Sequence, residues 1–144
     1  MPAPPAYFDT SVLVKHYVRE EGSARARALF RRHRVFSSAI APVELLSVLT
    51  RRRAAGELTE PDLAAIVARM RTDRGYWELV EVSERLLGRA EEFVQRTGVR
   101  TLDAIHLASV ATIRGAGLEL PFVTGDGRQR DAADRLEFDV VWVG

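Results

Sequence analysis

Short apolar segments alternate with helical segments along this chain, and this alternation limits the possible folds more than any other feature. Apolar runs predict strands over residues 6–9, 34–40, 76–82, 120–126 and 139–143. Helical spacing and capping residues predict helices over 10–20, 24–33, 42–56, 58–70, 84–98 and 127–136, and a further helix that Thr101 caps and that ends at Gly115 or Gly117. Strands that are separated by helices usually pair in parallel and are covered on both faces. The pattern therefore predicts an α/β sandwich with a mainly parallel sheet.

The length and composition limit the class of protein further. The chain has 144 residues, and we expect a single domain over residues 1–144. The formal net charge is +1, so the overall charge does not by itself require a nucleic-acid partner. The absence of cysteine excludes disulfides, thiolate metal sites and cysteine nucleophiles. No signal peptide is recognisable, and no apolar run approaches the roughly 20 residues of a membrane span. We expect a cytoplasmic protein without membrane association.

Four carboxylates stand where predicted strands end or predicted helices begin: Asp9, Glu44, Asp103 and Asp126. The carboxyl ends of parallel strands and the first turns of the helices that follow them meet at one edge of a sheet. We therefore expect these four side chains to share one pocket. Taken singly, each also has an ordinary structural role: an N-cap for Asp9, a turn residue for Asp126, and a helix-dipole partner for the other two.

Two more polar residues lie close to this acidic set in the sequence. His106 follows Asp103 by one helical turn, and its apolar surroundings favour a helix-face or core histidine over a direct catalytic role. Asp131 lies in a polar stretch and is expected at the surface. Whether either residue takes part in the site is open on the sequence alone.

A divalent cation would resolve the crowding of these carboxylates. Like charges at short range raise each other's pKa, so the four groups cannot all stay ionised in a bare pocket. Mg²⁺ or Mn²⁺ takes oxygen ligands and commonly rests on one or two protein carboxylates plus a substrate phosphate. Such an ion activates a water molecule and neutralises charge on a leaving oxygen. The histidines His16, His33 and His106, without any cysteine, do not favour a zinc site.

Four segments together are similar to a known family: YFDTSVLVK at 7–15, PVELLSVL at 42–49, RTLDAIHLAS at 100–109 and FVTGD at 122–126. In this order and spacing they resemble PIN domains, specifically the VapC-type ribonuclease toxins of bacterial toxin–antitoxin pairs. The resemblance covers essentially the whole chain. It implies a three-layer α/β/α fold with a five-stranded, mainly parallel sheet. It also implies endonucleolytic cleavage of RNA that leaves a 5′-phosphate and a 3′-hydroxyl.

The same resemblance implies roles for individual residues. Asp9 and Asp103 match the family's main positions for binding Mg²⁺ or Mn²⁺. Glu44 and Asp126 match the acidic positions that complete the metal environment and position the attacking water. Polar positions that support the site by hydrogen bonds match Thr10, Ser11 and Thr124. Such proteins are usually homodimers, and a small antitoxin silences them by inserting its C-terminal segment, often with an arginine, into the acidic site.

The chain departs from the family after Asp126, where it is more polar and has Glu137 and Phe138 in the region that tends to carry a glycine. Two other functions stay open. A haloacid-dehalogenase-like phosphatase would use Asp9 as its nucleophile, but it needs a second aspartate at position 11, where this chain has serine. A PIN-like or response-regulator-like acidic domain would bind RNA or a partner without cleaving anything.

Overall fold

The computed structural model describes residues 2–144; Met1, the first residue of the domain expected over 1–144, lies outside the described residues. Its strands form one sheet of five strands in the order β3-β2-β1-β4-β5, and every neighbouring pair is parallel. The strands are β1 (Pro5–Phe8), β2 (Arg34–Ser38), β3 (Glu78–Val80), β4 (Phe122–Thr124) and β5 (Val140–Trp142). The parallel sheet confirms the α/β class that the alternating pattern predicts.

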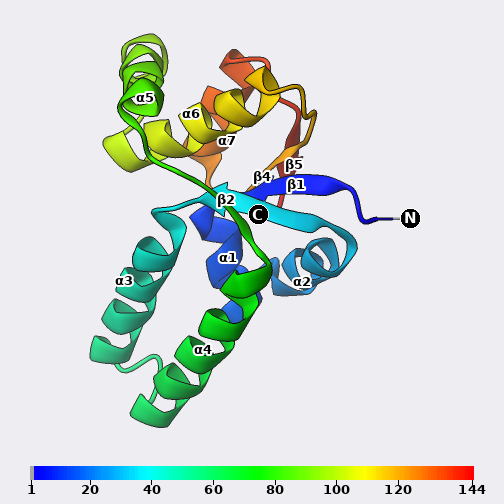
Figure 1. Ribbon diagram of the computed structural model, residues 1–144. Coiled ribbons are helices and arrows are strands. Elements are labelled where there is room, and N and C mark those ends of the chain that lie inside the picture. Colours follow the sequence, from blue (N-terminus) through cyan, green and yellow to red (C-terminus); the bar gives the residue numbers. More distant parts are fainter. Residues whose placement is uncertain (1) are drawn as a thin grey trace.

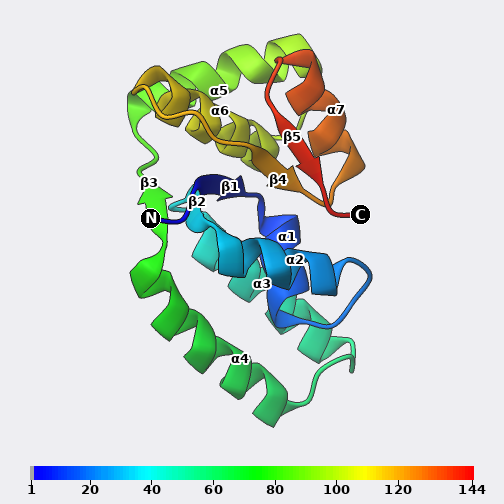
Figure 2. The ribbon, with the colours of Figure 1, turned by 90° about the vertical axis from the view of Figure 1, so that its right-hand side faces the viewer.

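Helices cover both faces of this sheet. Figure 1 shows one layer below it, formed by α1 (Thr10–Tyr17), α2 (Ser23–Arg32), α3 (Ala41–Ala54) and α4 (Glu60–Asp73). The layer above it contains α5 (Glu84–Thr97), α6 (Thr101–Gly115) and α7 (Gly127–Arg135), and Figure 2 shows the same two layers from the side. A short 3-10 turn, η1 (Arg74–Tyr76), leads from α4 into β3. The predicted three-layer α/β/α architecture is confirmed.

The two layers of helices enclose two separate cores, one on each face of the sheet. Successive side chains of a strand point to opposite faces. In β1, Ala6 and Phe8 join the core with α1 to α4, whereas Tyr7 joins the core with α5 to α7. In β4, Val123 and Phe122 are divided between the two cores in the same way. The sheet is therefore buried on both sides, and its loops and strand ends carry the accessible polar groups.

In the described residues, a side-chain cap starts four α-helices: α1, α4, α5 and α7. Thr59 and Asp62 form the capping box at the start of α4, and the Ser83 side chain caps α5. The prediction that Thr101 caps α6 is wrong. Arg100 holds the N-cap position, because its backbone is extended (φ −74°, ψ 165°), and it supplies no side-chain cap. Thr101 is the first residue of the helix.

Two further differences concern chain direction at element ends. The helix predicted over 10–20 stops at Tyr17, because Val18 is extended and Gly22, with φ 86°, turns the chain into α2. Beyond α7, Glu137 has φ 62° and is the one non-glycine residue with positive φ within residues 2–144. The left-handed turn therefore falls in the segment where the sequence departs from the family.

In the described part of the chain, no helix combines the length and apolar character that crossing a membrane requires.

Candidate active site

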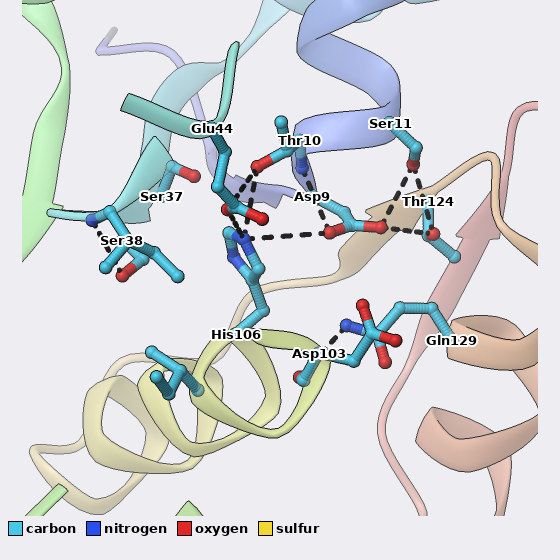
Figure 3. A network of polar contacts seen from close by, with 12 residues as sticks. Asp9, Thr10, Ser11, Ser37, Ser38, Glu44, Asp103, His106, Thr124 and Gln129 are labelled. Carbon is cyan, nitrogen blue, oxygen red and sulfur yellow. Dashed lines mark hydrogen bonds and ion pairs between the residues drawn. The ribbon is translucent and has the colours of Figure 1, made fainter. Parts of the chain in front are cut away.

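The carboxyl edge of the sheet gathers polar side chains from both layers, as Figure 3 shows. Asp9 follows β1 directly and is 4% exposed. Its carboxylate oxygen Oδ1 accepts a hydrogen bond from the backbone N–H of Thr10 at 3.0 Å, which confirms the N-cap role. Its Oδ2 accepts hydrogen bonds from Ser11 Oγ at 3.0 Å and Thr124 Oγ1 at 2.8 Å. Donors from α1 and β4 thus fix the Asp9 carboxylate at the end of β1.

His106 lies at the centre of this cluster. Its Nε2 is 2.6 Å from Glu44 Oε1 and 3.1 Å from Thr10 Oγ1, and its Nδ1 is 2.7 Å from the Tyr7 hydroxyl. The Thr10 hydroxyl also donates to Glu44 Oε1 at 2.8 Å. The expected core histidine is indeed buried, but every ring nitrogen has a polar partner in the site. In the sequence, His106 follows Asp103 by three residues. This spacing puts both side chains on one face of a helix and indicates that they share a site.

The charges of the site shift the pKa values of its buried groups. Burial lowers the pKa of the His106 imidazole, but the hydrogen bond to Glu44 and the nearby carboxylates outweigh it and hold the pKa above its ordinary value. Burial raises the pKa of the Asp9 carboxyl, although the charge of His106 and the hydroxyl donors oppose the rise. A protonated His106 is therefore a counter-charge inside the acidic cluster.

Asp103 stands opposite Asp9, in the first turn of α6. Among the described residues no donor hydrogen-bonds its half-buried carboxylate; only its backbone carbonyl has a side-chain donor, Gln129 Nε2 at 3.0 Å. Burial and the charges of Asp9, Asp126 and Glu44 raise the pKa of Asp103 to about 6, against an opposing contribution from His106. The charges of the other three carboxylates therefore act on Asp103, and all four lie at one edge of the sheet.

Asp103 lies at the sheet edge for another reason than the rule for helices that follow strands. A helix, α5, and not a strand, directly precedes α6, so the rule for helices that follow strands does not place this residue. Packing between α5 and α6 brings the first turn of α6 to the sheet edge. Gln129 was not recognised in the sequence; it is fully buried, and its Oε1 has no hydrogen-bond partner within residues 2–144.

Asp126 ends the loop after β4 and is the N-cap of α7. Its Oδ1 accepts hydrogen bonds from the backbone N–H groups of Arg128 at 2.9 Å and Gln129 at 3.4 Å. Its own N–H donates to Thr124 Oγ1 at 3.1 Å, and that hydroxyl donates to Asp9. A chain of hydrogen bonds therefore connects Asp126 to Asp9. Asp131, one turn further along α7, is exposed and its Oδ1 is 3.3 Å from the Nε of Arg130.

The donor set fits a hard divalent cation. All the carboxylates supply oxygen, the ligand that Mg²⁺ and Mn²⁺ prefer. Within residues 2–144, no three histidine or acidic side chains are already arranged as a metal-binding cluster. The Asp103 carboxylate nevertheless lies half-buried beside other anions without a compensating donor. A bound cation would supply the missing compensation.

A three-layer α/β/α domain with a cluster of carboxylates at the carboxyl edge of a parallel sheet is the class that this fold and site define. The profile of the PIN domain matches residues 6–135, so the chain belongs to the PIN-domain family. A sequence comparison with curated proteins finds no significant relative.

Solved structures share the fold over nearly the full length of this chain. A toxin–antitoxin complex from Klebsiella pneumoniae superposes with a TM-score of 0.68 at 17% identity, covering 94% of this chain and 95% of that one. VapC20 of Mycobacterium tuberculosis, a sarcin–ricin loop cleaving toxin, gives 0.67 at 20% identity, covering 88% and 94%. FitAcB from Neisseria gonorrhoeae gives 0.67 at 17% identity, covering 94% and 95%. At these identities the similarity establishes the fold.

Proposed function

We propose that this protein is a metal-dependent endoribonuclease and acts as the toxin of a type II toxin–antitoxin system. The observation that carries the proposal is the Asp103 carboxylate, which lies half-buried and without a hydrogen-bond donor beside Asp9 and Asp126. PIN nucleases generally use divalent metal ions. The similar fold of VapC20, which cleaves the sarcin–ricin loop, supports RNA as the substrate.

In this proposal Asp9 and Asp103 hold Mg²⁺ or Mn²⁺. When bound, the ion lowers the pKa of a water molecule and neutralises charge on the leaving oxygen of a phosphodiester. Ser11 and Thr124 keep the Asp9 carboxylate in one orientation through their hydrogen bonds to its Oδ2.

The other two carboxylates complete the catalytic set. Thr10 and His106 hold Glu44 at the site, where it orients the attacking water. Asp126, fixed as the N-cap of α7, contributes the fourth carboxylate and completes the metal environment.

The proposal also names the partners. The substrate is RNA, and a small antitoxin inhibits the enzyme by placing its C-terminal segment in the acidic site. The similar structures from Klebsiella pneumoniae and Neisseria gonorrhoeae, the first of them a toxin–antitoxin complex, support an antitoxin partner. We further propose that residues 1–144 form one domain, that the protein is a homodimer, and that it works in the cytoplasm, where its RNA substrates are.

Cleavage of RNA by the purified protein tests the function. We expect Mg²⁺ or Mn²⁺ to support cleavage and EDTA to abolish it. Asp9→Asn and Asp103→Asn should each reduce the rate by at least about a hundredfold, the scale on which one well-placed electrostatic contact acts. Asp134→Asn, which removes an exposed carboxylate from α7, is the matched control and should cleave normally.

The same experiment separates the alternatives. Cleavage by both site variants at the wild-type rate would overturn the assignment. RNA binding without any metal-dependent cleavage would favour the non-catalytic PIN-like domain. The phosphatase alternative finds no support in the site, because Ser11 donates its hydroxyl proton to Asp9 Oδ2 and supplies no second carboxylate.

A further inference from the structure

A separate pocket of about 220 Å³ adjoins the acidic site. The end of α5 and the loop that follows it, residues 97–100, form one wall, and side chains of α7 form the other. Asp103 lies between this pocket and the carboxylate cluster and lines both. An extended ligand in the pocket therefore leads directly to the acidic site.

Cationic side chains dominate this pocket. Arg100, Arg128 and Arg135 line it, and we call it the arginine pocket. The guanidinium groups of Arg100 and Arg128 have no hydrogen bond or ion pair with any residue in the range 2–144, and both side chains are exposed. Arg135 is held in place, because its Nη2 donates to the backbone carbonyl of Arg96 at 2.9 Å. Two cationic forks are thus available to a ligand.

The acidic residues of the arginine pocket do not cancel this charge. Asp131 is already engaged by Arg130, with 3.3 Å between Nε and Oδ1. Asp103 faces the other carboxylates. The start of α6 adds to the positive potential, because Arg100 at its N-cap supplies no side-chain acceptor for the first N–H groups of the helix. The start of α7, by contrast, is capped by Asp126.

We propose that the arginine pocket binds a phosphate group of the RNA strand next to the phosphate that is cleaved. This inference rests on the proposed ribonuclease function and specifies how the substrate is held. Without a metal ion the acidic cluster repels an RNA backbone, so a neighbouring basic surface has to hold the strand. Guanidinium forks match phosphate oxygens in geometry and charge. The shared position of Asp103 then aligns the next phosphate with the carboxylates.

Salt-dependent RNA binding by the full chain tests this pocket without relying on cleavage. The probe is a fluorescein-labelled, single-stranded oligoribonucleotide of mixed sequence, measured by anisotropy in EDTA over a series of salt concentrations. We expect Arg100→Gln/Arg128→Gln to bind more weakly and to reduce the slope of log Kd against log salt by about 0.7, the loss of one phosphate contact on a single strand. Arg135 is left unchanged, because it also caps α5.

The matched control is Arg25→Gln/Arg32→Gln, which removes the same charge from exposed positions of α2 in the opposite layer. Its slope should equal that of the wild type. A pocket variant whose slope changes no more than the control's overturns the inference. Loss of binding to a fluorescent poly-glutamate peptide with an unchanged RNA slope also overturns it, since the pocket would then take an acidic polypeptide.

Steady-state cleavage in Mn²⁺ tests this inference separately from the proposed ribonuclease function. We expect the pocket variant to raise KM about tenfold with little change in kcat, as loss of uniform substrate binding does. An unchanged KM in a pocket variant of an active enzyme contradicts the inference alone. Absence of metal-dependent cleavage by the wild type contradicts the ribonuclease function, and the salt slopes still decide whether the arginine pocket binds RNA.

Discussion

His106 Nε2 lies 2.6 Å from Glu44 Oε1, although 62 positions separate the two residues in the chain. The Tyr7 hydroxyl, 2.7 Å from Nδ1, fixes the other side of the ring. The pKa of His106 lies above its ordinary value because the hydrogen bond to Glu44 and the surrounding carboxylates outweigh the effect of burial. The pair therefore joins α3 to α6 across the acidic site and offsets part of its negative charge.

A double-mutant cycle measures this pair. Glu44→Gln and His106→Asn should show a favourable coupling energy of about 2 kcal/mol in the free energy of unfolding, because each single change removes the interaction and the second change loses nothing more. Urea unfolding in EDTA near pH 6 gives the value. The control cycle combines Glu44→Gln with Glu91→Gln, an exposed position on α5, and should be additive within about 0.5 kcal/mol. Additivity in both cycles would show that the contact contributes nothing to stability.

Asp126 combines an N-cap with a proposed catalytic charge, and two substitutions separate these roles. Asparagine is as good an N-cap as aspartate, so Asp126→Asn should keep the free energy of unfolding within about 0.5 kcal/mol of the wild type. Asp126→Ala should lose about 1 kcal/mol, because the N–H groups of Arg128 and Gln129 lose their acceptor. Both variants should lose about a hundredfold in RNA cleavage. Normal cleavage by the asparagine variant would show that Asp126 acts only as a helix cap.

Glu137 holds a backbone conformation that favours glycine. Its φ of 62° is costly for a side chain with a Cβ atom, and glycine adopts it freely. Glu137→Gly should therefore raise the free energy of unfolding by about 1 kcal/mol, measured by denaturant titration. The same change at Glu81, exposed and without positive φ, is the control and should destabilise the protein through the greater freedom of the unfolded chain. Destabilisation at both positions would mean that the turn stores no strain.

The sequence was sufficient for those parts of the site whose placement depends on local chemistry. Asp9 follows β1 directly, Asp126 follows β4 after Gly125, and each caps the next helix, so the end of the strand determines where the carboxylate lies. Glu44 follows from the proline at the start of α3, which marks the first helical turn. The layered fold can also be predicted from the alternation of strands and helices, because the spacing of apolar residues within each element indicates its type.

The remaining parts depend on contacts that no local pattern encodes. Tyr7 has the sequence environment of a core strand residue, and only the packing of α6 shows that its hydroxyl contacts His106. Gln129 lies in a polar helix, and its burial follows from the packing of α7 against β4 and α6. Asp103 reaches the site because of how α5 packs against α6, and helix–helix packing is set by surfaces far apart in sequence.

The pKa values of the site predict how the stability of the metal-free protein depends on pH. The pKa of Asp103 is raised from 3.8 to about 6, so its carboxyl favours the folded state below about pH 4 and loses that contribution as pH rises through about 6. The raised pKa of Asp9 acts in the same direction. The raised pKa of His106 extends the loss above its ordinary value of 6.5. In EDTA, the free energy of unfolding should fall as pH rises from about 4 through about 6, and it should keep falling above 6.5.

Asp103→Asn should remove a large part of this pH dependence, because it removes the carboxyl whose pKa is raised to about 6. Without its charge, the metal-free variant should be more stable than the wild type near pH 7 by on the order of 1 kcal/mol, after allowance for solvent screening of a half-exposed group. Near pH 4 the two proteins should be about equally stable. Added Mn²⁺ binds the folded wild-type site and should raise its Tm more than that of the variant. Thermal melts of the wild type, Asp103→Asn and the surface control Asp134→Asn provide the comparison. If Asp103 only complemented the α6 dipole, the variant would melt lower in EDTA and Mn²⁺ would shift both proteins equally, because the carboxylates would share no site.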